Sequence, residues 1–288
     1  MGSSCKHPRT RRFGFYKRKC DGRTIQRLKC LDCAKTLSTQ TAKLSYYSRH
    51  PWLDRAIFRT LCSGVSQRRC AENFGVKQKT IAQKLRRYAQ WANLEEAKSA
   101  AKHLPVELVQ FDDMEAFEHT KCKPLSIAVA VDQPTRRILS IQVSQMPAKG
   151  LLAAPARKKY GRRDDLRPGG WARLFQELKP QVGAMVRFES DKNPHYPKAL
   201  KKAFPQAEHK THKGRRGCVV GQGELKRGGF DPLFSLNHTC GMIRDNLKTL
   251  TRRTWCTVKK ISGLEALLAI YRWYHNHVRL MNPSKQQQ

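Results

Sequence analysis

The chain has 288 residues, enough for one catalytic domain with a smaller appendage, and its 57 Lys and Arg against 22 Asp and Glu give a formal net charge of +35. So large an excess destabilises a compact fold by self-repulsion, which excludes an ordinary cytosolic enzyme and indicates a polyanionic partner. A basic surface with no partner is the alternative, whereas a membrane-surface role lacks a separate basic amphipathic helix. No apolar run reaches the length of a membrane span, and the N-terminus has no signal-peptide core.

Cysteines mark the first region, which is basic and turn-rich. Because 10 cysteines are spread over a long basic chain, reduced thiols and a metal site are favoured over disulfides, and we expect a cytoplasmic, nucleoid-associated protein. Cys30 and Cys33 have the C-x2-C spacing that holds one zinc from a tight turn, and zinc takes four ligands. Cys5 and His7 are the natural candidates for the other two, with Cys20 as the substitute. A degenerate ribbon that binds no metal is the alternative.

The second region is predicted to be helical. Apolar residues at helical spacing predict a first helix that ends at Gly64. Ser66 is a typical N-cap for a second helix, a turn follows at Gly75, and a third helix covers residues 78–91. This is the helix-turn-helix pattern, in which cations contact DNA phosphates, and a solvated helix face is the alternative. The predicted DNA contacts here are Arg68, Arg69, Lys77, Lys79, Lys84, Arg86 and Arg87.

Beyond Pro105 the pattern changes to strands alternating with helices. A three-strand meander followed by a helix, a strand and further helices is a mixed α/β order. The expected strands are 107–117, 125–131, 137–143 and 185–189, the expected helices are 171–178, 196–204, 236–255 and 263–278, and 147–170 is expected to be a loop.

Acidic residues are rare in this chain, so those at the ends of predicted strands stand out. Asp112 and Asp113 follow an apolar stretch, and Asp191 follows another. Charges at the ends of core strands are costly unless something binds them, and two adjacent carboxylates suit Mg²⁺. Two such ions can activate the attacking oxygen and stabilise the leaving one in phosphoryl transfer. The alternative is that Asp112 caps a turn and that Asp191 caps the loop before Pro194.

Taken together, these motifs resemble DDE-type insertion-sequence transposases over nearly the whole chain, from Cys5 to about Leu280. The order of the five features is more specific than any one of them. Residues 26–33 resemble the zinc-ribbon head, the helix-turn-helix follows, 109–114 resemble the first catalytic strand, 188–191 with 195–197 the second carboxylate motif, and 236–244 with 250–255 and 259–260 the third, helical motif.

The resemblance implies an α/β fold with a ribonuclease-H-like mixed five-stranded sheet flanked by helices, with acids on the first strand and after the fourth. It implies cleavage and transfer of DNA strands with Mg²⁺ or Mn²⁺ and no covalent enzyme intermediate. Asp112 and Asp191 would carry the metals, and Asp113 would substitute for or assist Asp112. The implied partners are double-stranded DNA, as element ends and target, and further copies of the chain, with zinc as a structural ion.

One departure concerns the third position, which is usually Glu and is Asn237 here, beside His238 as a further candidate. A neutral amide binds Mg²⁺ more weakly than a carboxylate. Glu224 is the other candidate, although it lies outside the predicted helix. Three arginines on that helix either contact DNA phosphates or form a solvated cationic face. They are Arg244, Arg252 and Arg253.

The sequence therefore predicts a zinc-ribbon-like domain at 1–48, a helix-turn-helix domain at 49–103, a catalytic domain at 104–282 and a disordered tail at 283–288. The predicted function is that of an active transposase. An inactive or repurposed DNA-binding regulator derived from one is the alternative that Asn237 keeps open. An RNA-binding or ribosomal protein fits the charge but leaves the strand-end acids unexplained.

Overall fold

In the computed structural model the chain divides into two compact units, residues 1–57 and 58–288. None of the helices in the described part of the chain is long and apolar enough to cross a membrane. The structure describes residues 5–41, 43–46, 48–103, 105–213, 231–251 and 255–281.

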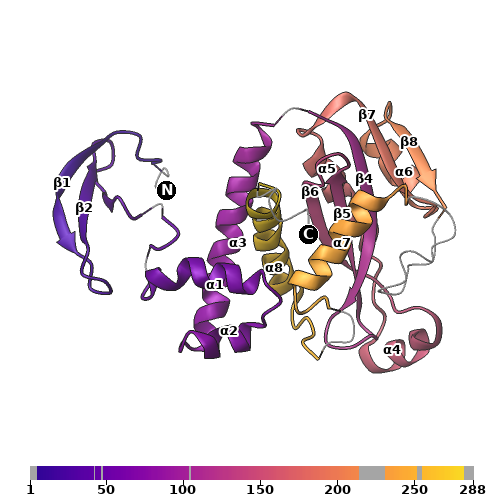
Figure 1. The fold of residues 1–288 in the computed structure, drawn as a ribbon, viewed down its shortest axis with the longest axis horizontal. Coiled ribbons are helices and arrows are strands. Elements are labelled where there is room, and N and C mark those ends of the chain that lie inside the picture. The colour runs from indigo at the N-terminus through magenta and orange to yellow at the C-terminus, as the bar shows by residue number, and fades with distance from the viewer. Residues whose placement is uncertain are drawn as a thin grey trace. The chain divides into compact units, whose positions relative to one another are not determined.

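The first unit contains a small antiparallel sheet in the order β1-β2-β3. Strands β1 and β2 lie side by side in Figure 1. Its strands are Thr10–Lys17, Thr24–Cys30 and Thr36–Ser38. Gly14, at φ +75°, sits in a β-bulge of β1 and accepts a hydrogen bond on its carbonyl from Gln26 Nε2 at 2.7 Å. The first region, for which the sequence predicts a zinc-ribbon-like domain without assigning strands, therefore contains three short antiparallel strands.

Three helices follow, and the second begins as predicted. They are α1 (Asp54–Leu61), α2 (Gln67–Asn73) and α3 (Gln78–Ala100). Ser66 caps α2, because its side chain accepts a hydrogen bond from the backbone N–H of Arg69 at 3.3 Å. The turn into α3 contains Gly75 at φ +61°, a conformation that glycine adopts without steric cost.

Helix α3 runs past the predicted end at Trp91 to Ala100 because its last turns are buried against α8 (Ile261–Tyr274) and the π-helical turn His275–Arg279. Glu96 is almost fully buried there and accepts hydrogen bonds from Asn276 Nδ2 at 3.0 Å and from His277 Nε2 at 2.8 Å. A charged residue on the buried face interrupts the apolar period that marks a helix in the sequence.

The second unit contains the five-stranded mixed sheet, in the order β6-β5-β4-β7-β8. Strands β4, β5 and β6 form an antiparallel meander, β7 runs parallel to β4, and β8 runs parallel to β7. The predicted α/β fold with a mixed five-stranded sheet flanked by helices is thus confirmed. The strands are β4 Val106–Phe117, β5 Pro124–Asp132, β6 Ile138–Gln145, β7 Val182–Asp191 and β8 Glu208–His212.

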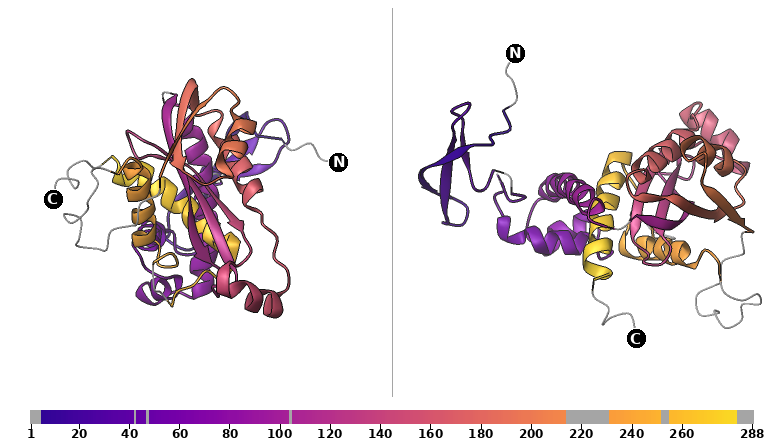
Figure 2. Two further views of the ribbon diagram at one scale, coloured as in Figure 1. Left: turned by 90° about the vertical axis from the view of Figure 1, so that its right-hand side faces the viewer. Right: turned by 90° about the horizontal axis from the view of Figure 1, so that it is seen from above.

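Helices cover both faces of this sheet (Figure 2). On one face α5 (Arg167–Leu178) and α6 (Tyr196–Ala203) bury an apolar core that includes Val109 and Phe111 of β4. On the other face lies α7 (Phe234–Asn246), whose Leu236 N–H donates to the side chain of Gln110 at 3.2 Å. Because side chains alternate along a strand, Val109 and Phe111 enter the core while Gln110, between them, faces α7.

Two further predicted elements, the loop over 147–170 and the helix over 236–255, differ from the structure. The loop expected over 147–170 contains the helix α4 (Ala153–Tyr160) and the first turn of α5. Only Ala156 of α4 is buried, so no apolar period shows in the sequence. The helix expected over 236–255 ends at Asn246, after which Leu247 is extended. Ile243, Leu247 and Leu250 are buried at helical spacing, which imitates a continuing helix.

Candidate functional site

The carboxylates predicted as a pair are held by two neighbouring parallel strands. Gln110 of β4 is in register with Glu189 of β7, and two residues further along each strand lie Asp112 and Asp191. Because the period of side chains along a strand is two, both acids are on the face that α7 covers. The fold thus brings together two acids that are 79 positions apart in the sequence.

Asp112 is half-buried and held by hydrogen bonds. One of its oxygens, Oδ1, accepts hydrogen bonds from the Tyr196 hydroxyl at 3.0 Å and from the Asp113 backbone N–H at 2.7 Å. Burial and the nearby charge of Asp191 raise the pKa of Asp112 to about 6, although both hydrogen bonds oppose the shift. The charge of Asp112 also adds to the effect of burial on Cys240 of α7, whose thiol has its pKa raised to about 12. Two carboxylates that repel each other in a partly buried place are stabilised by a cation.

If Asp112 is a metal ligand, its raised pKa predicts that the affinity for the metal depends on pH. A carboxylate ligand must be ionised, and Asp112 takes up a proton as the pH falls through about 6. We therefore expect the affinity for Mn²⁺ to be flat above pH 6 and to fall about tenfold per unit below it. Calorimetric titration of Mn²⁺ on either side of pH 6 measures this, and the Asp112→Asn variant should show no such step. An affinity that is equal on both sides in the unmodified chain would contradict the assignment.

Asp113 points toward the opposite face of β4 and is held by the core. Both of its carboxylate oxygens lie 3.1 Å from the indole Nε1 of Trp171, which is 3 % exposed. Burial raises the pKa of Asp113, and hydrogen bonds from Trp171 and Ser126 oppose the rise. Because both oxygens of Asp113 accept hydrogen bonds from Trp171, this carboxylate links β4 to α5.

The third predicted position lies at the start of α7. Asn237 is exposed, and its Nδ2 donates to Asp231 Oδ2 at 2.8 Å. His238 is also exposed and stacks at an angle against Phe234, with ring centroids 5.6 Å apart. In the described residues neither side chain is hydrogen-bonded to Asp112 or Asp191. Glu224, the other candidate, lies outside the described residues.

Sequence reasoning missed a polar cluster beside the two acids. Gln110 is fully buried and donates through Nε2 to Glu189 Oε2 at 2.9 Å and to the Pro232 carbonyl at 2.8 Å. Glu189 in turn lies 3.7 Å from His212 Nε2 of β8. Gln110 thereby ties β4, β7 and the entrance of α7 together. Gln110 lies two positions before Asp112, and Glu189 lies two positions before Asp191. This spacing is the sequence signal that could have indicated that Gln110 and Glu189 share a face of the sheet with the two acids.

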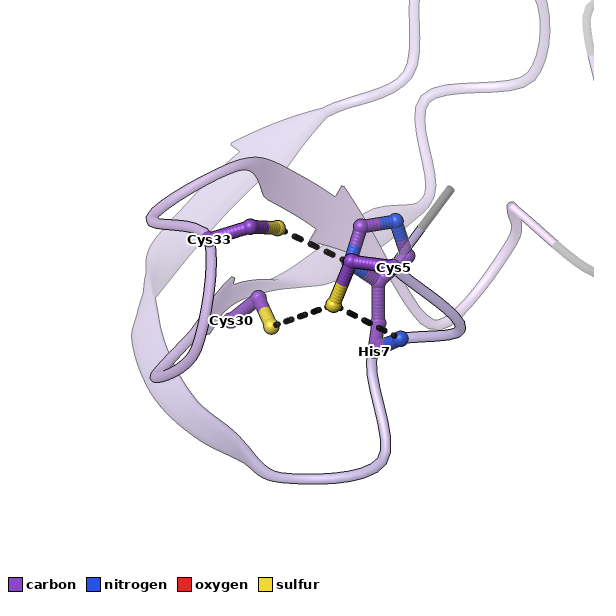
Figure 3. A group of neighbouring side chains, drawn as sticks. All are labelled: Cys5, His7, Cys30 and Cys33. Atoms are coloured by element: carbon purple, nitrogen blue, oxygen red, sulfur yellow. Dashed lines mark hydrogen bonds between the residues drawn. The ribbon is translucent and has the colours of Figure 1, made fainter. Parts of the chain in front are cut away.

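The second site is the cysteine cluster of the first unit (Figure 3). Ligand atoms of Cys5, His7, Cys30 and Cys33 all lie within 4.8 Å of one another. The Cys5 and Cys30 sulfurs are 3.9 Å apart, and the Cys33 sulfur is 3.2 Å from His7 Nδ1. Three thiols and one imidazole in a compact group match the ligand set of a structural zinc site. The set is the one predicted from the sequence, and Cys20, the substitute, is not part of it.

The electrostatics of this cluster also favour a metal. Burial opposes ionisation of the Cys30 thiol, but hydrogen bonds from the Cys33 backbone and the His7 side chain outweigh it and lower its pKa to about 7. A thiolate is the form that binds zinc. His7 and Ala34 adopt φ values of +54° and +59°, which turn the chain around the cluster. The cluster can therefore hold zinc.

The predicted DNA contacts of α2 and α3 fall into two groups. Lys84 is only 7 % exposed, because it shares the buried face of α3 with Ile81, Leu85 and Tyr88. Arg244 of α7 is half-buried, and Arg252 and Arg253 lie outside the described residues. The exposed members are Arg68, Arg69, Lys77, Lys79, Arg86 and Arg87.

The chain was compared with protein families, with curated proteins and with solved structures. No family model matches the chain, and no curated protein does. Among solved structures 11 chains match, and one of them belongs to the crystal structure of the Mos1 mariner paired end complex with Mn. That alignment has 13% sequence identity and a TM-score of 0.29, and it covers 80% of this chain and 77% of that one. Similarity at this level assigns no role to any residue.

Proposed function

We propose that the chain is a DDE-type DNA transposase that binds the ends of an insertion element and catalyses divalent-metal-dependent cleavage and transfer of DNA strands. The observation that carries the proposal is the pairing of Asp112 and Asp191 on adjacent parallel strands, with Asp112 partly buried and its pKa raised. In a chain of net charge +35, a carboxylate pair kept at this cost calls for a cation and a polyanionic substrate. Cleavage of element-end DNA by the intact chain and by an Asp191→Ala variant tests it.

The residues of the site divide the work. Asp112 and Asp191 would hold Mg²⁺ or Mn²⁺, which supplies Lewis-acid activation of the attacking oxygen and stabilises the leaving one. The Tyr196 hydroxyl orients Asp112 by donating to Oδ1, and Asp113 anchors β4 to α5 through Trp171. Asn237 and His238, at the exposed start of α7, are proposed to complete the site from the helix once DNA is bound.

DNA recognition is proposed to lie outside the catalytic sheet. We propose a zinc ribbon at 1–48 with Zn²⁺ on Cys5, His7, Cys30 and Cys33, a helix-turn-helix reader at 49–103 and a catalytic part at 104–282. The exposed cations of α2 and α3 fit contact with phosphates of double-stranded DNA. Two ends must be joined, so we propose a homo-oligomer on DNA, acting in the cytoplasm at the nucleoid.

Charge reversal on α3 is expected to weaken duplex binding. The Lys79→Glu/Arg86→Glu variant changes two exposed cations near the start of α3. If both contact phosphates, the plot of log affinity against log salt should become shallower by about 2, with lower affinity at every salt concentration. Fluorescence anisotropy of labelled duplex across a salt series measures both quantities.

The matched control changes the same charge at the other end of α3. Lys98 and Lys102 are exposed, and Lys98 pairs with Glu95 at 2.8 Å. The Lys98→Glu/Lys102→Glu variant should bind duplex with nearly the original slope. Equal slopes in the two double variants would rule out the start of α3 as the DNA reader.

A second candidate function is a DNA-binding regulator without catalysis. The observation that favours it is Asn237, which brings no charge and donates its amide to Asp231. The two candidates differ in one outcome, because the regulator binds element ends tightly but cleaves nothing in the presence of Mn²⁺.

A further inference from the structure

Strand β1 exposes aromatic rings, and the charged residues of the sheet strands are all cations. All eight of its residues are exposed, and Phe13 and Tyr16 are 42% and 37% exposed. Strands β1, β2 and β3 contain no acidic residue. Exposed apolar groups gathered on one face generally mark an interaction site. The neighbouring cations of the strands are Arg11, Arg12, Lys17, Arg27 and Lys29.

The bulge of β1 determines which rings share a face. Arg12 pairs with Leu28 and Phe15 with Gln26, so one extra residue is inserted between Arg12 and Phe15. Phe13 lies against Arg27 and Lys29, whose cationic groups are 5.4 and 5.5 Å from its ring centroid.

Tyr16 is paired with Ile25, and Arg11 with Lys29. Ile25, Arg27 and Lys29 alternate on one face of β2, so the bulge brings Phe13 and Tyr16 onto that same face. In a regular strand, residues three positions apart point to opposite sides, so the bulge is what places both rings on one face. This surface, which consists of Arg11, Phe13, Tyr16, Arg27 and Lys29, is called the β1 face below.

We propose that the β1 face binds single-stranded DNA by stacking unpaired bases on Phe13 and Tyr16, with the three cations contacting phosphates. Aromatic rings interleaved with cations are the usual means of binding single strands without sequence preference. Because the bulge adds one residue, Phe13 and Tyr16 are separated along the strand by the length of two regular residues, roughly 7 Å. That spacing is about twice the 3.4 Å between stacked bases of a duplex, so it suits a strand whose bases are separated.

A second copy of the chain is the other occupant that an exposed edge strand could take. Positive charges along an edge strand discourage pairing with an identical edge, and Arg11, Arg12 and Lys17 line this one. The same charges attract a polyanion. The choice of DNA rather than RNA rests on the proposed function, because a strand-cleaving enzyme exposes unpaired DNA at the ends of its substrate. The stacking site itself is inferred from the β1 face alone.

The test measures binding of fluorescein-labelled oligothymidylate to the full chain by anisotropy. Phe13→Ala and Tyr16→Ala should each reduce affinity about tenfold, the loss typical of one base–ring stack. Phe15→Ala is the matched control, since Phe15 is on the same strand and 66% exposed but pairs with Gln26 on the opposite face. It should leave affinity unchanged. The zinc content of each variant is measured as a folding control, and it should equal that of the unmodified chain.

Three results would overturn the proposal. Stacking on the β1 face would be excluded if all three variants bound as tightly as the unmodified chain. It would also be excluded if Phe15→Ala lost as much affinity as Phe13→Ala and Tyr16→Ala. Tighter binding of oligouridylate that responds to the same variants would assign the face to RNA instead. Because this assay contains no Mg²⁺, no Mn²⁺ and no element end, its failure leaves the cleavage assay unaffected, and failure of cleavage leaves this result standing.

Discussion

The Asp112→Asn variant is expected to lose cleavage of element-end DNA by about a thousandfold or more, while binding the same DNA with unchanged affinity. A metal that stabilises the charge of the transition state contributes several kcal/mol, and each 1.36 kcal/mol is a factor of ten in rate. Asn keeps the shape of Asp112 and can still accept the hydrogen bond from Tyr196. The loss would therefore report the charge alone. Rates are measured as nicked product against time with Mn²⁺ in excess.

The control for this prediction is its neighbour. Asp113 has the same chemistry one residue away, but its carboxylate is held by Trp171 on the opposite face. Asp113→Asn should reduce cleavage by about tenfold or less, through the position of β4 and α5. If Asp113→Asn abolished cleavage and Asp112→Asn did not, the metal-binding acid of β4 would be Asp113.

Loss of the zinc cluster is the second large expected effect. Structural zinc sites contribute an apparent 10–16 kcal/mol to the folding of small zinc modules. Cys30 is 1 % exposed and lies at the end of β2, so Cys30→Ser removes a buried ligand from the centre of the ribbon. We expect the bound zinc, about one ion per chain, to be lost, together with protection of the β2 amides from hydrogen exchange.

Cys20→Ser is the matched control, because Cys20 is half-buried in the same unit but is not in the cluster. Its zinc content should equal that of the unmodified chain. The five-stranded sheet belongs to the other unit, so its amides should remain protected in both variants. Zinc retained in Cys30→Ser and Cys33→Ser alike would mean that the cluster holds no metal.

The features that could be predicted from the sequence are those with a local physical cause. Charges at the ends of apolar stretches marked Asp112 and Asp191, because such placement is costly. The C-x2-C spacing marked Cys30 and Cys33, and the N-cap preference of serine marked the start of α2 at Ser66.

What could not be predicted depends on contacts between distant parts of the chain. Strand β8 has the sequence Glu208–His212, without one apolar residue, and is a strand only because it pairs with β7. The partnership of Gln110 with Glu189 depends on the register of β4 and β7. The charge of Lys84 predicts an exposed side chain, but Lys84 lies on the buried face of α3. In each case tertiary packing overrides the local pattern.

The most direct test of the central claim is cleavage of DNA that carries the ends of the flanking element, with Mg²⁺ or Mn²⁺, by the purified chain and its Asp191→Ala variant. Asp191 ends β7 beside Asp112, so the variant removes half of the proposed metal site. The proposed function predicts nicked or joined products that need the metal and are absent with Asp191→Ala. Tight binding of those ends without any cleavage by the unmodified chain would contradict it.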